Sequence, residues 1–350
     1  LTMAQSSFTQ VLRRLNDLKQ LTQMATVLVT MLPLITMMIL LPDLGSILMD
    51  VLTPILEAIS PVVPGEIFPY FFTMEMFQRA LISAIIVTVV AGLLGTFLLI
   101  RNLALIGDGL AHVSFGGVAI GVVLGASSPL WYALVFSVAA SIIIYELQSR
   151  EILTGDASIA IFLTGMLAMG LVALRLGGGG ITTDIEGYLF GNLLLIDEAG
   201  LNMISIICLS SILILFSIRN GLLATTVDPL SAAVQGIPVR NIGLLFSVIT
   251  AAVVVSMVQI VGALLVTSLL VTPAATAQLV GKSFRSCMIL TQIFGISSVL
   301  IGLYLSSELE TGSGSMIALV TAIVFCLVAL IRATLANQID SFTNPEISKE

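Results

Sequence analysis

The chain has 350 residues, of which 58% are hydrophobic and only 9% are charged, whereas a soluble domain carries roughly 25% charged residues. Its net charge is −7 and its mean hydropathy is +1.14. This composition excludes an ordinary soluble domain, gives no sign of a nucleic-acid partner, and predicts an integral protein of the lipid bilayer.

Long apolar runs predict an all-α fold, a polytopic transmembrane helical bundle, because a spanning helix needs about 20 apolar residues. The ten predicted segments are 23–42, 76–100, 103–125, 130–147, 157–175, 200–218, 241–259, 262–280, 286–306 and 314–332. The pair 241–259 and 262–280 is the least certain, since it also reads as one run with a break near Gly262. We expect an extension at 1–74 with one extra membrane helix and an external loop, a transmembrane domain at 75–335, and a cytoplasmic tail at 336–350.

Lys and Arg favour cytoplasmic loops, and their positions test this topology. With the N-terminus inside, eleven of the thirteen fall on the cytoplasmic side, and only Arg79 and Arg175 fall outside. Eleven acidic residues fall outside and give that face a net charge of −9, which attracts cations over a long range. They are Asp43, Asp50, Glu57, Glu66, Glu75, Asp184, Glu186, Asp197, Glu198, Glu308 and Glu310. The external stretch LGSILMDVLTPILEAIS fits an amphipathic interfacial helix.

The segment LIGDGLAHVSFGGVAIGVVLG holds the only histidine, His112, four residues after Asp108. Residues i and i+4 share a helix face, and a rise of about 1.5 Å per residue puts His112 roughly 14 Å into segment 103–125, near the bilayer midplane. A buried hydrogen bond between the two side chains would explain them structurally. Ionisable residues inside a membrane are functional candidates by default, and a carboxylate with an imidazole suits Zn²⁺, Mn²⁺ or Fe²⁺. We therefore expect a transit site for a divalent transition metal, carried as substrate, with no permanently bound cofactor.

Gly117, Gly121 and Gly125 form a GxxxGxxxG row on the same helix, which favours close helix packing. This row is offset by about 100° from the stripe Asp108–His112–Gly116. We expect the glycine row to pack against a neighbouring helix and the stripe to line a pathway.

The cytoplasmic stretch TTVDPLSAAVQGIPVRN predicts a short capped helix. Asp228 can cap it, Pro229 suits its first position, and Gly236 can end it. Such a helix could be an ordinary loop helix or a docking element for a partner.

Gly281-Lys282-Ser283 resembles the end of a nucleotide-binding P-loop, but Thr276 stands where the first glycine is required. No enzymatic motif is present, so any ATP hydrolysis belongs to a separate subunit.

Four stretches resemble the integral permease subunit of zinc, manganese and iron ABC importers: GLLGTFLLIRNLALIGDGLAHVSFGGVAIG (92–121), GYLFGNLL (187–194), TVDPLSAAVQGIPV (226–239) and VGALLVTSLLVTPAATAQLV (261–280). The resemblance covers about residues 74–332. It implies an ABC-importer permease in a prokaryotic plasma membrane, with cytoplasmic ATPase subunits, an extracytoplasmic metal-binding protein and a second permease subunit, as in a homodimer. Asp108 and His112 match the family's metal contacts, Asp228 to Gly236 its ATPase-coupling helix, and Pro273 a proline at a helix break.

Gln259 and Thr267 are further pathway candidates.

Two other functions remain open. A permease for a chelated metal or cofactor would not need a bare-metal ligand pair, and an ion-coupled secondary transporter would use the pair as a proton relay. The second reading is disfavoured because the sequence shows no second copy of the Asp–His helix, as an inverted repeat would.

Overall fold

The fold is all-α. The computed structural model describes residues 43–343 except 127, 178–182, 192, 194–195 and 264, and for residues 183–186 and 335–343 it describes the backbone alone. Within these residues every regular element is a helix, so the predicted fold class is confirmed. The predicted segment 23–42 and residues 344–350 of the predicted tail 336–350 lie outside the described residues.

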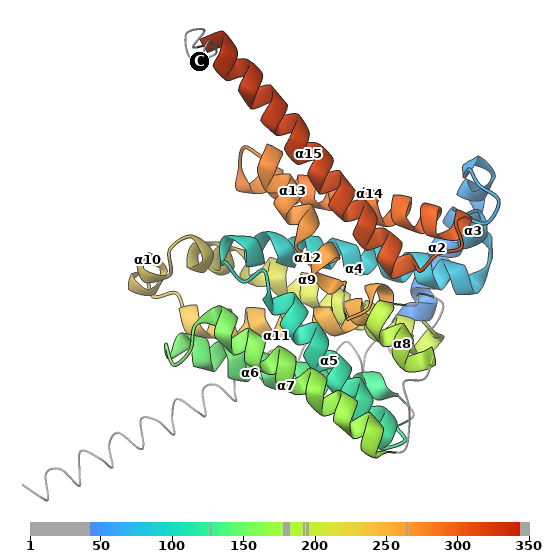
Figure 1. Ribbon diagram of the computed structural model, residues 1–350, viewed down its shortest axis with the longest axis horizontal. Coiled ribbons are helices and arrows are strands. Elements are labelled where there is room, and N and C mark those ends of the chain that lie inside the picture. The colour runs from blue at the N-terminus through green and yellow to red at the C-terminus, as the bar shows by residue number, and fades with distance from the viewer. Residues whose placement is uncertain are drawn as a thin grey trace, which may run out of the picture.

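Long helices run side by side through the molecule (Figure 1). In chain order the elements are α2 (Leu44–Ile59), η1 (Ser60–Val62), α3 (Tyr70–Thr73), α4 (Glu75–Ile100), α5 (Ile106–Val123), α6 (Pro129–Ser149), α7 (Gly155–Leu176), α8 (Thr183–Phe190), α9 (Glu198–Val227), α10 (Pro229–Val234), α11 (Val239–Val261), α12 (Val266–Leu270), α13 (Thr272–Val280), α14 (Phe284–Glu308) and α15 (Ser313–Thr343). Helices α4, α5, α6, α7, α9, α11, α14 and α15 coincide with predicted segments. These eight, together with the run Leu44–Val62, are long and apolar enough to cross a membrane.

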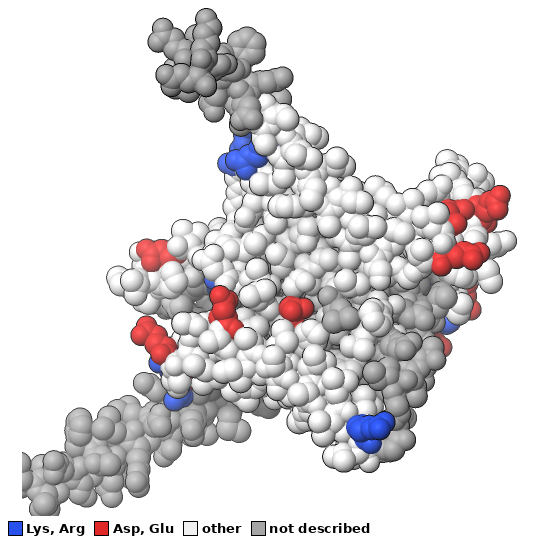
Figure 2. Space-filling model, viewed as in Figure 1, with Lys and Arg blue, Asp and Glu red and all other residues white. Residues whose placement is uncertain are grey.

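The bundle has two ends, named here after the helices that lie there. At one, which we call the α2 end, lie α2, the first turns of α4 and α9, and the last turn of α14. At the other, the α10 end, lie α10 and the elbow between α4 and α5. Figure 1 shows α2 and α10 at opposite ends. In Figure 2 most of the visible surface is uncharged, and acidic side chains gather over α2 and α3.

Segment 262–280 departs from the predicted single helix. Gly262 adopts a φ of +86° at the end of α11, a conformation that residues with a Cβ avoid. The chain then returns through two short helices, α12 and α13. Phe284, which follows them, packs on Phe97 near the α10 end with ring centroids 5.2 Å apart. Separate crossings for 241–259 and 262–280 therefore fit the structure, but the second crossing is broken.

A carboxylate on α14 holds the loop between η1 and α3. The Glu308 side chain accepts hydrogen bonds from the backbone N–H groups of Glu66, Ile67 and Phe68 at 3.0–3.2 Å. Gly65, just before them, has a φ of +113°, and a Cβ there would collide with the Glu308 carboxylate. Charge-assisted bonds of this kind are stronger than neutral ones, so Glu308 ties the N-terminal helices to α14.

We expect Glu308→Ala to free the loop at 63–69. Amide hydrogen exchange at residues 66–68 should accelerate at least about 10-fold, because three backbone donors lose their acceptor, while exchange in α9 and α11 stays unchanged. Glu310→Ala is the matched control, since Glu310 accepts none of these three bonds. Equal protection of residues 66–68 in wild type and Glu308→Ala would contradict this assignment.

Candidate functional site

Asp108 and His112 lie on one side of α5, as their spacing predicts. Nε2 of His112 stands 3.9 Å from Oδ1 of Asp108, and the side chains are 8% and 29% exposed, respectively. This distance is too long for a hydrogen bond, and Nδ1 of His112 is buried with no partner. Two donors on one zinc-sized ion stand about 3–3.5 Å apart, given bonds near 2.1 Å. The pair is therefore close to, but slightly wider than, the geometry of two ligands on one cation.

Helix α5 begins later than the predicted segment 103–125. Helix α5 begins at Ile106, because residues 101–105 form an elbow after α4. At 1.5 Å per residue, His112 lies about 9 Å along a helix about 27 Å long, and Asp108 about 3 Å along it. The prediction counted His112 at roughly 14 Å from the start of segment 103–125, so the later helix start shortens its distance along the helix by about 5 Å.

Glycines let the neighbours of α5 approach its backbone. A Cβ at Gly117 would lie 2.7 Å from Cα of Ala133 in α6, and Gly121 meets Pro129 of the same helix. Gly125 has a φ of +68° and open space around it, so it follows the helix end and the predicted row stops at Gly121. Gly116 was expected to line a pathway, which is wrong: a Cβ there would lie 2.6 Å from the Met166 carbonyl oxygen of α7. These glycines therefore pack α5 closely against α6 on one side and α7 on another.

The break between α12 and α13 lies beside the same helix. A Cβ at Gly95 of α4 would overlap the carbonyl oxygen of Leu270, and a Cβ at Gly107 would lie 2.6 Å from the Leu270 side chain. Gly107 immediately precedes Asp108. The sequence did not single out Gly95, Gly107 or Leu270, because glycine and leucine are common in membrane helices. Only the contact between these residues in the folded structure marks them as part of the site. Discontinuous helices of this kind accompany substrate sites in transporters.

The predicted capped helix is present as α10. Oδ1 of Asp228 accepts hydrogen bonds from the N–H groups of Leu230 and Ser231 at 3.0 and 3.1 Å. Hydrogen bonds from the Ser231 hydroxyl and backbone, with that from Leu230, hold the pKa of Asp228 below its usual value. Pro229 occupies the first turn, and Gly236 ends the helix with a φ of +81°. Leu230 and Val234, one turn apart, are 82% and 89% exposed.

The weaker pathway candidates are spread over the bundle. Gln259 lies near the end of α11 beside Gly200 of α9, at the α2 end, and its Oε1 is buried without a partner. Thr267 is half-buried in α12. Pro273 is the second residue of α13, is buried, and lies next to Gly295 of α14. The structure brings Asp108 and His112 together but places Gln259 at the far end from them.

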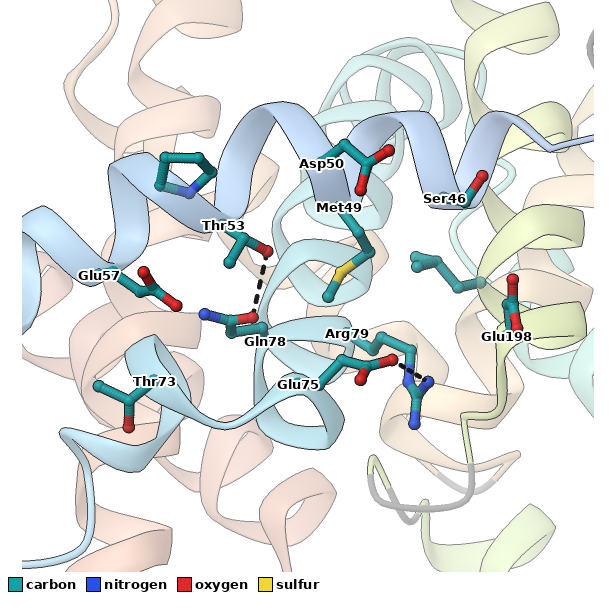
Figure 3. A pocket seen from close by; sticks show the side chains of 12 residues that line it. Ser46, Met49, Asp50, Thr53, Glu57, Thr73, Glu75, Gln78, Arg79 and Glu198 are labelled. Carbon is teal, nitrogen blue, oxygen red and sulfur yellow. Dashed lines mark hydrogen bonds and ion pairs between the residues drawn. The ribbon is translucent and has the colours of Figure 1, made fainter.

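An acid-lined cavity of about 530 Å³ opens at the α2 end, between α2 and the first turns of α4 and α9. Figure 3 shows Asp50 and Glu57 on α2 across from Glu75 on α4, with Glu198 at one side. Arg79 also lines the cavity, and its charge is offset by Glu75 at 2.9 Å. Thr53 bonds to Gln78 and holds α2 against α4. This end of the molecule therefore presents a hollow of net negative charge.

The apolar helices form a multi-pass membrane bundle, and an ionisable pair on one helix beside a broken crossing is typical of membrane transport proteins. A family model described as the ABC 3 transport family matches residues 73–332. The chain belongs to this family and is a transmembrane permease subunit of an ABC transporter. Helix α2 and the loop that Glu308 holds precede the matched residues.

The relatives include permeases named for two metals. The manganese import system permease protein ScaB of Streptococcus parasanguinis is 34% identical over 71% of this chain and 88% of its own length. The manganese transport system membrane protein MntC of Halalkalibacterium halodurans is 33% identical over 74% and 88%. The high-affinity zinc uptake system membrane protein ZnuB of Haemophilus influenzae is 31% identical over 72% and 96%.

Two solved structures share the fold. A chain of PsaBC from Streptococcus pneumoniae, solved in complex with Fab, matches with a TM-score of 0.66 and 32% identity over 74% of this chain and 92% of that one. An inward-facing metal-chelate type ABC transporter matches with a TM-score of 0.63 over 80% and 97%, at 18% identity. The second match concerns the fold alone.

Proposed function

We propose that this chain is the permease of an ATP-driven importer for a divalent transition metal, with Mn²⁺ as the first candidate and Zn²⁺ as the second. The observation that carries the proposal is the Asp108–His112 pair, whose donors face the same space 3.9 Å apart with no hydrogen bond between them. A carboxylate oxygen and an imidazole nitrogen form a donor set that Mn²⁺ and Zn²⁺ both accept. Several relatives are named as manganese permeases and one as a zinc permease.

Two donors hold a metal ion weakly, and a transit site needs further ligands that can leave. The described residues contain no group of three His, Cys, Asp or Glu side chains able to hold a metal. A second copy of this chain, with its own Asp108 and His112 facing the first pair, would complete a four-donor site, and water would fill the remaining positions. Asp108 is 29% exposed, which leaves its carboxylate accessible to a partner or an ion.

The acidic side chains at the α2 end support an orientation. The α2 end faces outward, where its acid-lined cavity raises the local concentration of cations and an extracytoplasmic metal-binding protein delivers the ion. The α10 end faces the cytoplasm. There α10 offers Leu230 and Val234 as two apolar anchors one turn apart, which suits docking into a groove of the ATPase subunit.

Uptake competition tests this function. In cells lacking their own manganese and zinc importers, the permease expressed with its ATPase and binding protein should take up radioactive Mn²⁺. Excess Zn²⁺ should compete more strongly than excess Ca²⁺ or Mg²⁺, because the imidazole disfavours hard cations. Uptake that persists without the ATPase would support a secondary transporter instead. Uptake of a chelated metal that survives His112→Ala would support the chelate permease.

A further inference from the structure

Arg101 lies at the elbow between α4 and α5, and its partners are on α9 and α11. Its Nε donates to the Thr226 hydroxyl and its Nη2 to the Thr225 hydroxyl, both at 2.9 Å. The guanidinium also lies over the ring of Phe246, 4.8 Å from its centroid. Within the described part of the chain Arg101 forms no ion pair, and burial lowers the pKa of its guanidinium.

The two threonine hydroxyls are oriented to receive the guanidinium. Each donates its own proton to the Leu222 carbonyl one turn earlier in α9, so its oxygen lone pairs are left for Arg101. The guanidinium fork can bond two acceptors in a fixed geometry, which a lysine ammonium cannot reproduce. Neutral partners bind a buried cation less strongly than a carboxylate would. The hydrogen bonds from Arg101 to the two threonines therefore fix a specific geometry but are weaker than a buried ion pair would be.

The two sides of this contact lead to two different sites. On the α9 side, Thr226 is two residues from Asp228, which caps α10. On the other side the elbow is short and internally bonded: Leu103 N–H binds the Leu98 carbonyl and Ile106 N–H binds that of Leu103. Helix α5 starts directly after this elbow, with Asp108 in its first turn. Arg101 therefore joins the base of α10 to the start of the helix that carries Asp108 and His112.

We propose that Arg101 is a positioning residue that couples α10 to α5, so that a displacement of α10 by the ATPase subunit moves the Asp108–His112 pair. This inference rests on the proposed function. Coupling between distant sites can pass through elements that are bonded and packed in a continuous series. A coupling of this kind is established only when both sites are shown to change the conformation of the same element. The number of ATP molecules hydrolysed for each metal ion transported measures this coupling.

The experiment uses the complete transporter, with ATPase and binding protein, reconstituted in liposomes with Mn²⁺ and ATP. In Arg101→Met, and in the double variant Thr225→Val/Thr226→Val, we expect the ratio of ATP hydrolysed to Mn²⁺ transported to rise at least 10-fold. Subunit assembly and ATP hydrolysis should stay within twofold of wild type. Arg101→Lys, which keeps the charge and loses the fork, should give an intermediate ratio.

Two controls isolate the effect. Arg219→Met removes a guanidinium that lies 4.5 Å from the ring centroid of Phe216 within α9 itself, and Thr164→Val removes an exposed hydroxyl that bonds only within α7. Both should keep the wild-type ratio. An unchanged ratio in Arg101→Met and in the double variant, or a proportional loss of hydrolysis and transport in both, would overturn the inference. If Arg101→Met fails to assemble, the double variant decides, because it keeps the arginine. Failure of the wild-type transporter to carry Mn²⁺ or Zn²⁺ would instead refute the proposed function.

Discussion

Replacing His112 or Asp108 with alanine should abolish metal uptake while the permease still inserts and assembles. Loss of an outer-shell partner of a metal ligand already costs about 10–100-fold in affinity, so loss of a direct ligand should reduce uptake at least that much. Folding should survive because neither side chain makes a hydrogen bond to another described residue. Removal of an ionisable group from an apolar helix also lowers the cost of inserting that helix. Radioactive Mn²⁺ uptake, normalised to permease in the membrane, measures the effect.

Ser114→Ala is the matched control for these variants. Ser114 lies two residues after His112 on a different side of α5, is fully buried, and has an unpartnered hydroxyl. Its loss changes the polarity of the helix without touching the pair, so uptake should stay near wild type. Wild-type uptake in both His112→Ala and Asp108→Ala would refute the assignment of the transit site.

The second large effect is expected at α10. Gly236→Leu forces a side chain into the left-handed region, at a cost of about 1–2 kcal/mol for an ordinary residue. Asp228→Ala removes the side-chain acceptor for the N–H groups of Leu230 and Ser231. Both changes distort the helix that presents Leu230 and Val234, so the ATPase should bind less tightly and coupled transport should fall. Co-purification of the ATPase with the permease, together with Mn²⁺ uptake, measures the result.

The open space around Gly236 means that Gly236→Leu tests the backbone conformation alone. A Cβ there meets no atom within 4 Å, so the penalty for leucine comes from the backbone angle and not from a clash. Asn tolerates the left-handed region better than other residues with a Cβ. Gly236→Asn should therefore retain most ATPase binding. A normal yield of ATPase with normal transport in both Asp228→Ala and Gly236→Leu would show that α10 is not the docking element.

The sequence predicted the long helices well because each is a continuous apolar run bounded by charges or glycine. Hydropathy alone predicted 262–280 as one segment, because the run is equally apolar, whereas the helix breaks between Leu270 and Thr272; the family resemblance had indicated a break at Pro273. Hydropathy reports burial in lipid and contains no signal for a change of helix direction. At the break the carbonyl oxygen of Leu270 lies directly against Gly95, a residue more than 170 positions away in the chain, and hydropathy cannot predict such a contact.

The Asp–His pair was predictable because both residues lie on one helix, where spacing alone sets their relation. Gly116 was misassigned for a related reason: its angular position was right, but which neighbour covers that side of α5 is a property of the tertiary structure. Contacts such as Arg101 with Thr225 and Thr226, or Glu308 with the loop at 66–68, join residues more than 100 positions apart. Each of those residues alone is unremarkable in a membrane protein.

The glycine contacts of α5 also bear on the surrounding lipid. Because Gly116 and Gly117 bring the backbones of α7 and α6 directly against α5, small side-chain adjustments cannot absorb a displacement between these helices. Any movement of His112 relative to α9 and α11 must then carry α6 and α7 with it. Both outer helices expose apolar side chains such as Val135 and Val172, so their movement displaces acyl chains and alters the area that the protein occupies in the bilayer. Lateral pressure and acyl-chain order therefore enter the free energy of the conformational cycle.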